Sequence, residues 1–158
     1  MLDTPKIVQT DVQPIAYVHL TIPREEIQSV MGPGLGEVMA AVAAQGLTPT
    51  GPWFDHHLKM TPDIFNFEIC VPVKSPIKPA GRVKAGQLPA SRVARTIYRG
   101  PYEGLGDAWE EFMGWIAGQG LTPREDLWQC YLTGPELNPN PATWSTELNR
   151  PLLSPLNA

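Results

Sequence analysis

The residues with the clearest chemical potential lie in two short apolar segments, FEICV from Phe67 and WQCYL from Trp128. Aligning the segments pairs Glu68 with Gln129 and Cys70 with Tyr131. Side chains alternate across a strand, so in each segment these polar positions share one face. We predict that this face is a pocket wall. The opposite faces, which we expect to cover a helix-packed core, carry Phe67, Ile69, Val71, Trp128, Cys130 and Leu132.

Glu68 is the strongest candidate for charge chemistry, because a carboxylate between Phe67 and Ile69 is costly to bury unless it is used. Our hypothesis is that Glu68 pairs with a cationic ligand. The alternative is a solvent-facing glutamate on a half-exposed sheet.

Aromatic side chains are the second candidate for ligand binding. Stacking and cation–π contacts are worth about 0.5–2 kcal/mol each. Tyr102 is the best candidate, since it follows Gly-Pro directly before an expected helix. The predicted cleft-lining set is Trp53, Tyr102, Trp109 and Tyr131, whereas Phe112, Trp115 and Trp128 are assigned to the core. For each of these aromatics, core packing is the alternative.

His56 and His57 are adjacent, so on a strand they would point to opposite faces, and His57 is a candidate for the cleft. A metal site needs further converging ligands, and the sequence offers none. The serines lie in no nucleophile motif. We therefore predict no metal and no cofactor.

Two repeated stretches must position these residues: GLGEVMAAVAAQGLTP from Gly34 and GLGDAWEEFMGWIAGQGLTP from Gly104. Their apolar spacing predicts helices over residues 37–45 and 107–119, the second longer by a turn. Gly46 and Gly120 end the helices. The GLG triplets are interpreted as tight turns into each helix.

The predicted strands cover residues 14–22, 64–73, 91–100, 127–134 and 143–152. The stretch 46–63 is expected to be a loop. The Pro- and Lys-rich stretch 73–90 is expected to be a surface connection. Each half thus follows the order strand, loop, helix, loop, strand.

Neither half has enough apolar surface to fold alone, so we predict one α+β domain over residues 1–158. It would contain pseudo-twofold duplicated strand-helix-strand units, at about residues 5–73 and 91–150, in an antiparallel sheet. Two helices would pack on one face, with a central ligand cleft between the repeats. The alternative is an old duplication with a filled centre.

The overall composition excludes several classes of protein. The net charge of the 158 residues is −4, which disfavours direct nucleic-acid binding. The cluster Lys74, Lys78, Arg82 and Lys84 is interpreted as a solvated loop. No signal peptide or apolar run of membrane-spanning length is present. Cys70 and Cys130 match no metal or redox motif, so we expect a cytoplasmic protein. The sequence does not predict an oligomeric state.

The stretches RTIYRGPYEGLGDAWEEFMGWIAGQGL and WQCYLTGPELNPNPATWSTELNRPL, together with FEICVPV, carry a family likeness. In this order the chain resembles the GyrI-like small-molecule-binding domain, the effector-binding domain of AraC-type and MerR-type multidrug regulators. The resemblance implies a pseudo-symmetric α+β fold and an aromatic-lined cleft for flat or cationic organic compounds. The first strand is expected near residue 7, so the resemblance implies a stand-alone member without a DNA-binding segment.

One departure concerns Gln129, where the resemblance implies a glutamate that serves as the anion for cationic ligands. An amide carries no charge and cannot act as a general base. Glu68 would then supply the charge. Our first interpretation is that the protein binds small aromatic or cationic molecules. The alternatives are a hydrolase of electrophilic, cyclopropane-bearing compounds using Glu68 or Tyr102, and a protein-partner module that binds gyrase or a regulator.

Overall fold

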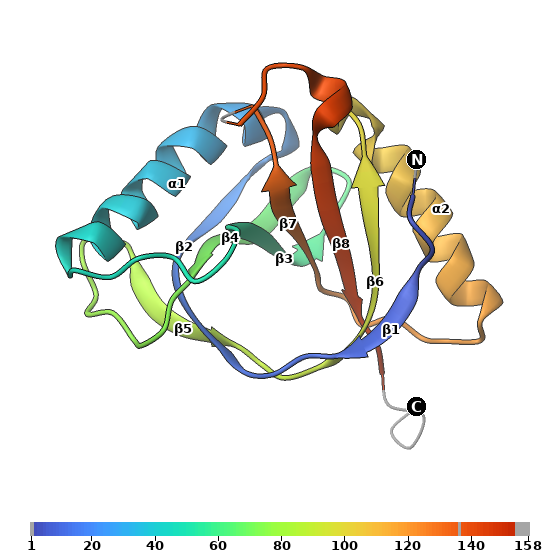
Figure 1. Ribbon diagram of the computed structural model, residues 1–158, viewed down its shortest axis with the longest axis horizontal. Helices are drawn as coiled ribbons and strands as arrows, with labels where there is room; N and C mark the ends of the chain where they lie inside the picture. The colour runs from blue at the N-terminus through green and yellow to red at the C-terminus, as the bar shows by residue number, and fades with distance from the viewer. Residues whose placement is uncertain (1, 136, 154–158) are drawn as a thin grey trace. The chain divides into compact units, whose positions relative to one another are not determined.

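The computed structural model describes residues 2–135 and 137–153, apart from the side chain of Met60. Its internal contacts divide the chain into two compact units. The first unit comprises residues 11–90. The second comprises the residues up to Thr10 and those from Ser91 onward. Each unit contains one long helix and four antiparallel strands (Figure 1).

The first unit is built from β2 and the helix that follows it. Its elements in chain order are β2 (Gln13–Pro23), α1 (Ile27–Ala44), β3 (Phe54–Met60), β4 (Ile64–Pro72) and β5 (Lys84–Leu88). The strands pair antiparallel in the order β3-β4-β2-β5.

The second unit repeats this arrangement with other strands. Its elements are β1 (Lys6–Gln9), β6 (Arg92–Arg99), α2 (Leu105–Gly118), β7 (Leu127–Thr133) and β8 (Ser145–Pro151). The antiparallel order is β7-β8-β6-β1. In each unit, one edge strand comes from a part of the chain next to the other unit's first long strand. β1 precedes β2 in the sequence but pairs with β6, and β5 precedes β6 but pairs with β2.

The predicted α+β class is confirmed, as are the strands that correspond to β2, β4, β6, β7 and β8. Two stretches predicted to be loops contain strands, so these two predictions were wrong. The stretch 46–63 contains β3. Its sequence FDHHLKM shows no clear alternation of apolar and polar residues, because the adjacent His56 and His57 interrupt the pattern. The surface connection 73–90 contains β5, a short edge strand held by backbone pairing to β2.

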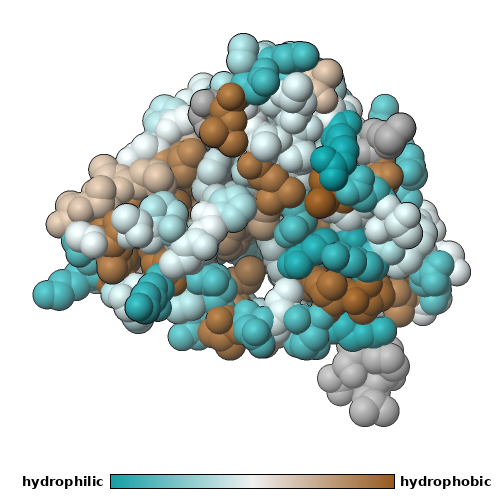
Figure 2. Space-filling view, in the orientation of Figure 1, coloured by the Kyte–Doolittle hydropathy of each residue, from teal (hydrophilic) through white to brown (hydrophobic). Residues whose placement is uncertain are grey.

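The core of the first unit lies between α1 and the sheet. Phe67, Ile69 and Val71 of β4 are fully buried there and face α1, as predicted. The helix contributes Val38, Ala41 and Val42. Its solvent side carries small residues, and Figure 2 shows pale, weakly hydrophobic surface over α1.

α1 is longer than predicted and passes through Gly32, Pro33 and Gly34. Proline and glycine disfavour a helix locally. However, the chain on both sides of Pro33 packs on the core at helical spacing, through Ile27, Val30, Met31 and Leu35. α1 therefore has 18 residues and α2 has 14, so the predicted extra turn in the second helix was wrong.

The core of the second unit forms under α2. Ala108, Phe112 and Ile116 of the helix pack against Tyr98 of β6 and Leu148 of β8, among others. Phe112 is fully buried, as predicted, and Trp115 packs at the margin of this core. Trp128 is also buried, but the cluster under α2 does not include it.

Candidate functional site

The ends of the two helices provide a better alignment than the GLG triplets do. Matching QGLTP after each helix pairs β3 with β7, so Asp55 corresponds to Gln129 and His57 to Tyr131. Both strands have a register shift directly after the matched position, between His57 and Lys59 and between Tyr131 and Thr133. The shared irregularity supports this alignment.

This alignment corrects the predicted pairing of Glu68 with Gln129. Asp55 lies opposite Ile69 in β4, and Gln129 lies opposite Leu148 in β8. Glu68 therefore corresponds to Glu147, not to Gln129. The earlier pairing failed because it treated β4 as the strand that follows α1.

Gln129 and Tyr131 face α2, contrary to the expectation that they lie away from the helix. The Trp109 indole Nε1 on α2 donates a 2.8 Å hydrogen bond to Gln129 Oε1. The Gln129 Nε2 donates to the Tyr131 hydroxyl at 3.3 Å. Trp128 and Cys130, which alternate with these residues, therefore face away from α2 and do not cover its core.

Four aromatic residues and one amide of the second unit form what we name the aromatic cluster: Tyr102, Trp109, Gln129, Tyr131 and Trp144. The Tyr102 ring lies 5.8 Å from the Tyr131 ring and 4.7 Å from the Trp144 ring, measured between centroids. The four aromatic side chains are half-buried, whereas Gln129 is only 8% exposed. Each ring thus keeps an accessible portion while the amide beneath is shielded from water.

Local structure holds the cluster in place. Tyr102 starts the 3₁₀ turn Tyr102–Gly104, which leads into α2. The Tyr98 hydroxyl donates a 2.7 Å hydrogen bond to the Pro101 carbonyl and anchors this turn to β6. A Cβ at Gly104 would collide with that hydroxyl, so the turn requires glycine there. The Trp144 indole donates to the Asn138 carbonyl at 2.8 Å.

The equivalent positions of the first unit are filled differently. His57 stacks on Phe67 with ring centroids 5.1 Å apart, and Phe65 meets His57 edge-on at 5.2 Å. The His57 Nε2 lies 3.5 Å from Asp55 Oδ2. Where the first unit has Phe67, the second unit has the much smaller Thr146. The first unit thus has a phenyl ring opposite His57 at the position where the second unit has a small threonine side chain opposite Tyr131.

Glu68 lies on the other face of its sheet, away from α1. It is half-buried, and its Oε1 is 3.6 Å from His56 Nδ1 on β3. His19 of β2 faces Glu68 from the other neighbouring strand. His56 and His57 point to opposite faces, as predicted for adjacent residues of a strand.

The predicted site residues thus separate into groups. Tyr102, Trp109, Gln129 and Tyr131 come together in the second unit. Glu68 and His57 lie on opposite faces of the sheet of the first unit, and Trp53 packs at the margin of that unit's core.

Trp144 and Thr146 are the two residues that sequence reasoning missed. The signal that identifies them is their position. They precede Glu147 as Phe65 and Phe67 precede Glu68, a match that becomes visible only once β3 is recognised.

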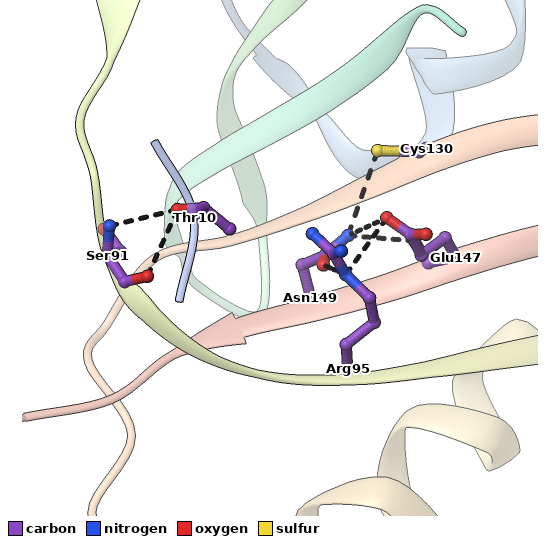
Figure 3. A network of polar contacts seen from close by, with 6 residues as sticks. All are labelled: Thr10, Ser91, Arg95, Cys130, Glu147 and Asn149. Atoms are coloured by element: carbon purple, nitrogen blue, oxygen red, sulfur yellow. Dashed lines mark hydrogen bonds and ion pairs between the residues drawn. The ribbon is translucent and has the colours of Figure 1, made fainter. Parts of the chain in front are cut away.

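A second polar cluster of the second unit lies on the face away from α2 (Figure 3). Glu147 Oε1 is 3.3 Å from Arg95 Nε and accepts a 3.1 Å hydrogen bond from Asn149 Nδ2. The same Asn149 amide donates to the Cys130 sulfur at 3.8 Å. These contacts satisfy Glu147, the counterpart of Glu68, within the sheet. We interpret this network as structural.

Thr10 and Ser91 join the ends of the chain segments that form the second unit. The Thr10 hydroxyl donates to the Ser91 carbonyl at 3.1 Å and accepts from the Ser91 amide at 3.0 Å (Figure 3). This reciprocal pair closes the junction where β1 meets the β6 segment. It positions the sheet and takes no part in the aromatic cluster.

Among the described residues, no group of three or more His, Cys, Asp and Glu side chains is arranged to hold a metal ion. None of the helices in the described part of the chain is long and apolar enough to cross a membrane.

The family model of the GyrI-like small molecule binding domain matches residues 3–152. No curated protein matches the chain. The structure resembles the EcmrR C-terminal domain with a TM-score of 0.84 and 22% identity, covering 96% of this chain and 98% of that one. In the EcmrR–DNA complex the match covers 94% of this chain and 57% of the EcmrR chain.

Two more distant structures share the fold. SAV2435, solved bound to tetraphenylphosphonium, has a TM-score of 0.70 and 13% identity over 96% of this chain and 95% of that one. A hydrolase from Listeria innocua has a TM-score of 0.63 and 13% identity over 94% and 91% of the two chains. At these identities the likeness concerns the fold alone.

Proposed function

Because the chain belongs to the GyrI-like small-molecule-binding family, we propose that its aromatic cluster binds a small aromatic organic molecule. The observation that carries this proposal is the Tyr102 ring, which contacts both Tyr131 and Trp144 while remaining half-buried. Aromatic pairs contribute about 0.5–1.5 kcal/mol beyond their buried area, so a flat ligand gains from each ring it meets.

The relatives support an aromatic ligand in a limited way. SAV2435 was solved with tetraphenylphosphonium, a compound of four phenyl rings. The family description names small molecules as the ligands. The prediction that a cleft between the repeats holds the ligand stays a prediction.

A titration with aromatic probes tests the proposal. The intrinsic tryptophan fluorescence should be quenched as tetraphenylphosphonium or 9-fluorenone binds near Trp109 and Trp144. Tyr102→Leu should weaken binding about tenfold or more, because one ring contact and its stacking are lost. Tyr17→Leu is the matched control, since Tyr17 is also half-buried but lies on β2 of the first unit. Equal loss in both variants, or no quenching by either probe, would contradict the proposal.

A second candidate function is hydrolysis, which the Glu68–His56 pair favours. The two side chains lie 3.6 Å apart and both are largely shielded, an arrangement that lets a carboxylate accept a proton from water. The electrophile would be a small strained ring compound. Turnover that is lost in Glu68→Gln would support hydrolysis, whereas the absence of turnover in the wild type would leave binding as the sole function.

Charge and cysteine chemistry bear on partner and compartment. The net charge of −4 supports a small-molecule ligand over direct nucleic-acid binding. Cys70 and Cys130 carry thiols and not a disulfide, which is typical of a reducing compartment and supports a cytoplasmic location.

A further inference from the structure

We propose that Thr146 is a ligand-binding residue of the aromatic cluster and selects aromatic ligands that carry a hydrogen-bond acceptor, such as a carbonyl oxygen. The Thr146 hydroxyl donates its proton to that acceptor while the rings of the cluster stack on the ligand. This inference rests on the proposed function and names the ligand class of the same site.

Thr146 lies on β8 between two of the aromatic side chains. It pairs with Tyr131 of β7, and residues directly opposite each other in an antiparallel pair point to the same face. Trp144 precedes it by two positions in extended backbone, and side chains two positions apart also share a face. The Tyr102 ring contacts both Tyr131 and Trp144. Thr146 is therefore flanked by two of the three rings that a bound aromatic molecule would meet.

The Thr146 hydroxyl is buried without a hydrogen-bond partner. None of the residue's surface is exposed, and within the part of the chain that the structure describes its oxygen forms no hydrogen bond. A buried polar group that is left unpaired costs free energy, which a well-formed hydrogen bond recovers. Buried hydroxyls in folded proteins nearly always have such a partner. An unpaired hydroxyl beside three ligand-accessible rings is therefore a group that a ligand can satisfy.

Packing alone does not explain a threonine at this position. The equivalent residue of the first unit is Phe67, whose ring is fully buried and stacks on His57. The same place in the fold thus accepts a purely apolar side chain. Valine has the shape of threonine and no polar atom to satisfy, so it would fill the position of Thr146 without the cost of the unpaired hydroxyl.

The single proton of the hydroxyl decides the class of ligand. A threonine hydroxyl has one proton to donate and two lone pairs that accept. Buried donors are rarely left without a partner, whereas oxygen lone pairs are unpaired more often. The matching ligand group is therefore an acceptor. A carbonyl conjugated to flat rings places its oxygen in the plane of the rings, so that it can reach Thr146 while the ring faces stack.

Three tricyclic probes of similar shape test this selectivity. 9-Fluorenone carries an acceptor, carbazole carries an N–H donor, and fluorene carries neither. Equilibrium dialysis measures the dissociation constant of each. We expect the wild type to bind fluorenone about three- to tenfold more tightly than fluorene, the range of one net hydrogen bond. Carbazole should bind more weakly than fluorenone.

Substitutions of Thr146 assign the preference to its hydroxyl. Thr146→Val should reduce the fluorenone-to-fluorene ratio to below about twofold and leave the affinity for fluorene unchanged. Thr146→Ser keeps the hydroxyl and should retain the preference. The infrared carbonyl stretch of bound fluorenone should move to higher frequency in Thr146→Val, because a hydrogen bond weakens the carbonyl bond. Thr96→Val is the matched control and should preserve the ratio, since that buried hydroxyl is already paired with the Asp3 carbonyl.

The outcomes separate this inference from the proposed function. A ratio that Thr146→Val leaves unchanged, or an equal loss of affinity for fluorenone and fluorene, would overturn the inference alone. Wild-type protein that binds fluorene or carbazole as tightly as fluorenone would do the same. If Thr146→Val does not fold, as judged by circular dichroism, Thr146→Ala removes the same hydroxyl and decides. Wild-type protein that binds none of the three probes would overturn the proposed function.

Discussion

At the residue scale, two buried threonines of the second unit differ in one hydrogen bond. Thr96 of β6 and Thr146 of β8 are both nearly inaccessible to solvent. The Thr96 hydroxyl donates a 2.7 Å hydrogen bond to the Asp3 carbonyl, whereas that of Thr146 has no hydrogen-bond partner among the residues that the structure describes. Replacing each by valine keeps the shape and removes only the hydroxyl.

We expect Thr146→Val to raise the free energy of unfolding by about 1 kcal/mol, because an unsatisfied buried group is removed. Thr96→Val should lower it by a similar amount, about 1 kcal/mol, because a hydrogen bond is lost. Urea unfolding of both variants measures the two changes. Changes of the same sign would contradict the different roles assigned to the two hydroxyls.

At the element scale, the GLG triplets serve packing and not ligand binding. The first glycine of each triplet lies against the sheet. A Cβ at Gly34 would come within 2.5 Å of Ile69 Cδ1, and one at Gly104 would collide with the Tyr98 hydroxyl. The second glycines, Gly36 and Gly106, have nothing within 4 Å of such a Cβ. Packing against neighbouring side chains therefore constrains the first glycine of each triplet and not the second.

Gly104→Ala should destabilise the second unit and weaken aromatic-probe binding, because the displaced Tyr98 hydroxyl no longer anchors the turn that carries Tyr102. Gly114→Ala is the matched control within α2, at a position with open space. It should raise stability by up to about 1 kcal/mol through helix propensity alone. Thermal unfolding followed by circular dichroism measures both. A stable Gly104→Ala variant with unchanged binding would show that the turn tolerates the shift.

At the scale of the whole molecule, one exposed ion pair in each unit joins segments distant in sequence. Asp3 forms a bidentate pair with Arg99 in the second unit, at 3.1 and 3.0 Å. Glu37 of α1 forms one with Arg82 in the first unit, at 2.8 and 2.9 Å. The arginine hydrogen bonds lower the pKa of Asp3 and of Glu37 below their ordinary values of 3.8 and 4.5.

These lowered pKa values predict a dependence of stability on pH. A carboxyl group whose folded pKa lies below its unfolded value stabilises the fold above the unfolded pKa, and this contribution disappears as the pH falls through the folded pKa. Arg99→Ala and Arg82→Ala should therefore be less stable than the wild type near pH 7. The deficit should shrink as the pH falls below about 4. Because both pairs are exposed, it should also shrink at high salt.

Urea midpoints between pH 3 and pH 7 measure this effect for each variant. Lys74→Ala, which removes an exposed cation of the first unit, controls for the change in net charge. A deficit that stays constant across this pH range would show that the arginines act through packing and not through the carboxylates.

Much of the fold was predictable from local pattern. The alternation in residues 14–22 identified β2, and the aromatic and β-branched residues in 64–73 identified β4. The aromatic cluster was partly predictable as well. Tyr102, Trp109, Gln129 and Tyr131 were named from their types and their places beside the helix.

Other features were hidden because local signals opposed the tertiary structure. Pro33 and its neighbouring glycines concealed the first half of α1, which packing on the core maintains. His56 and His57 concealed β3, and without β3 the alignment of the repeats shifted by one strand. Glu68 was then paired with Gln129, and the roles of Trp144 and Thr146 were missed.

The sequence by itself determined the class of the fold, the family and most of the strands, because hydrophobic periodicity and turn residues act over a few neighbours. Only the tertiary structure decided which face of each strand meets a helix. That choice depends on pairing register, and a shift of one position moves every side chain to the other face. The hydrogen bond from Trp109 places Gln129 and Tyr131 beneath α2, and no local pattern contains that contact.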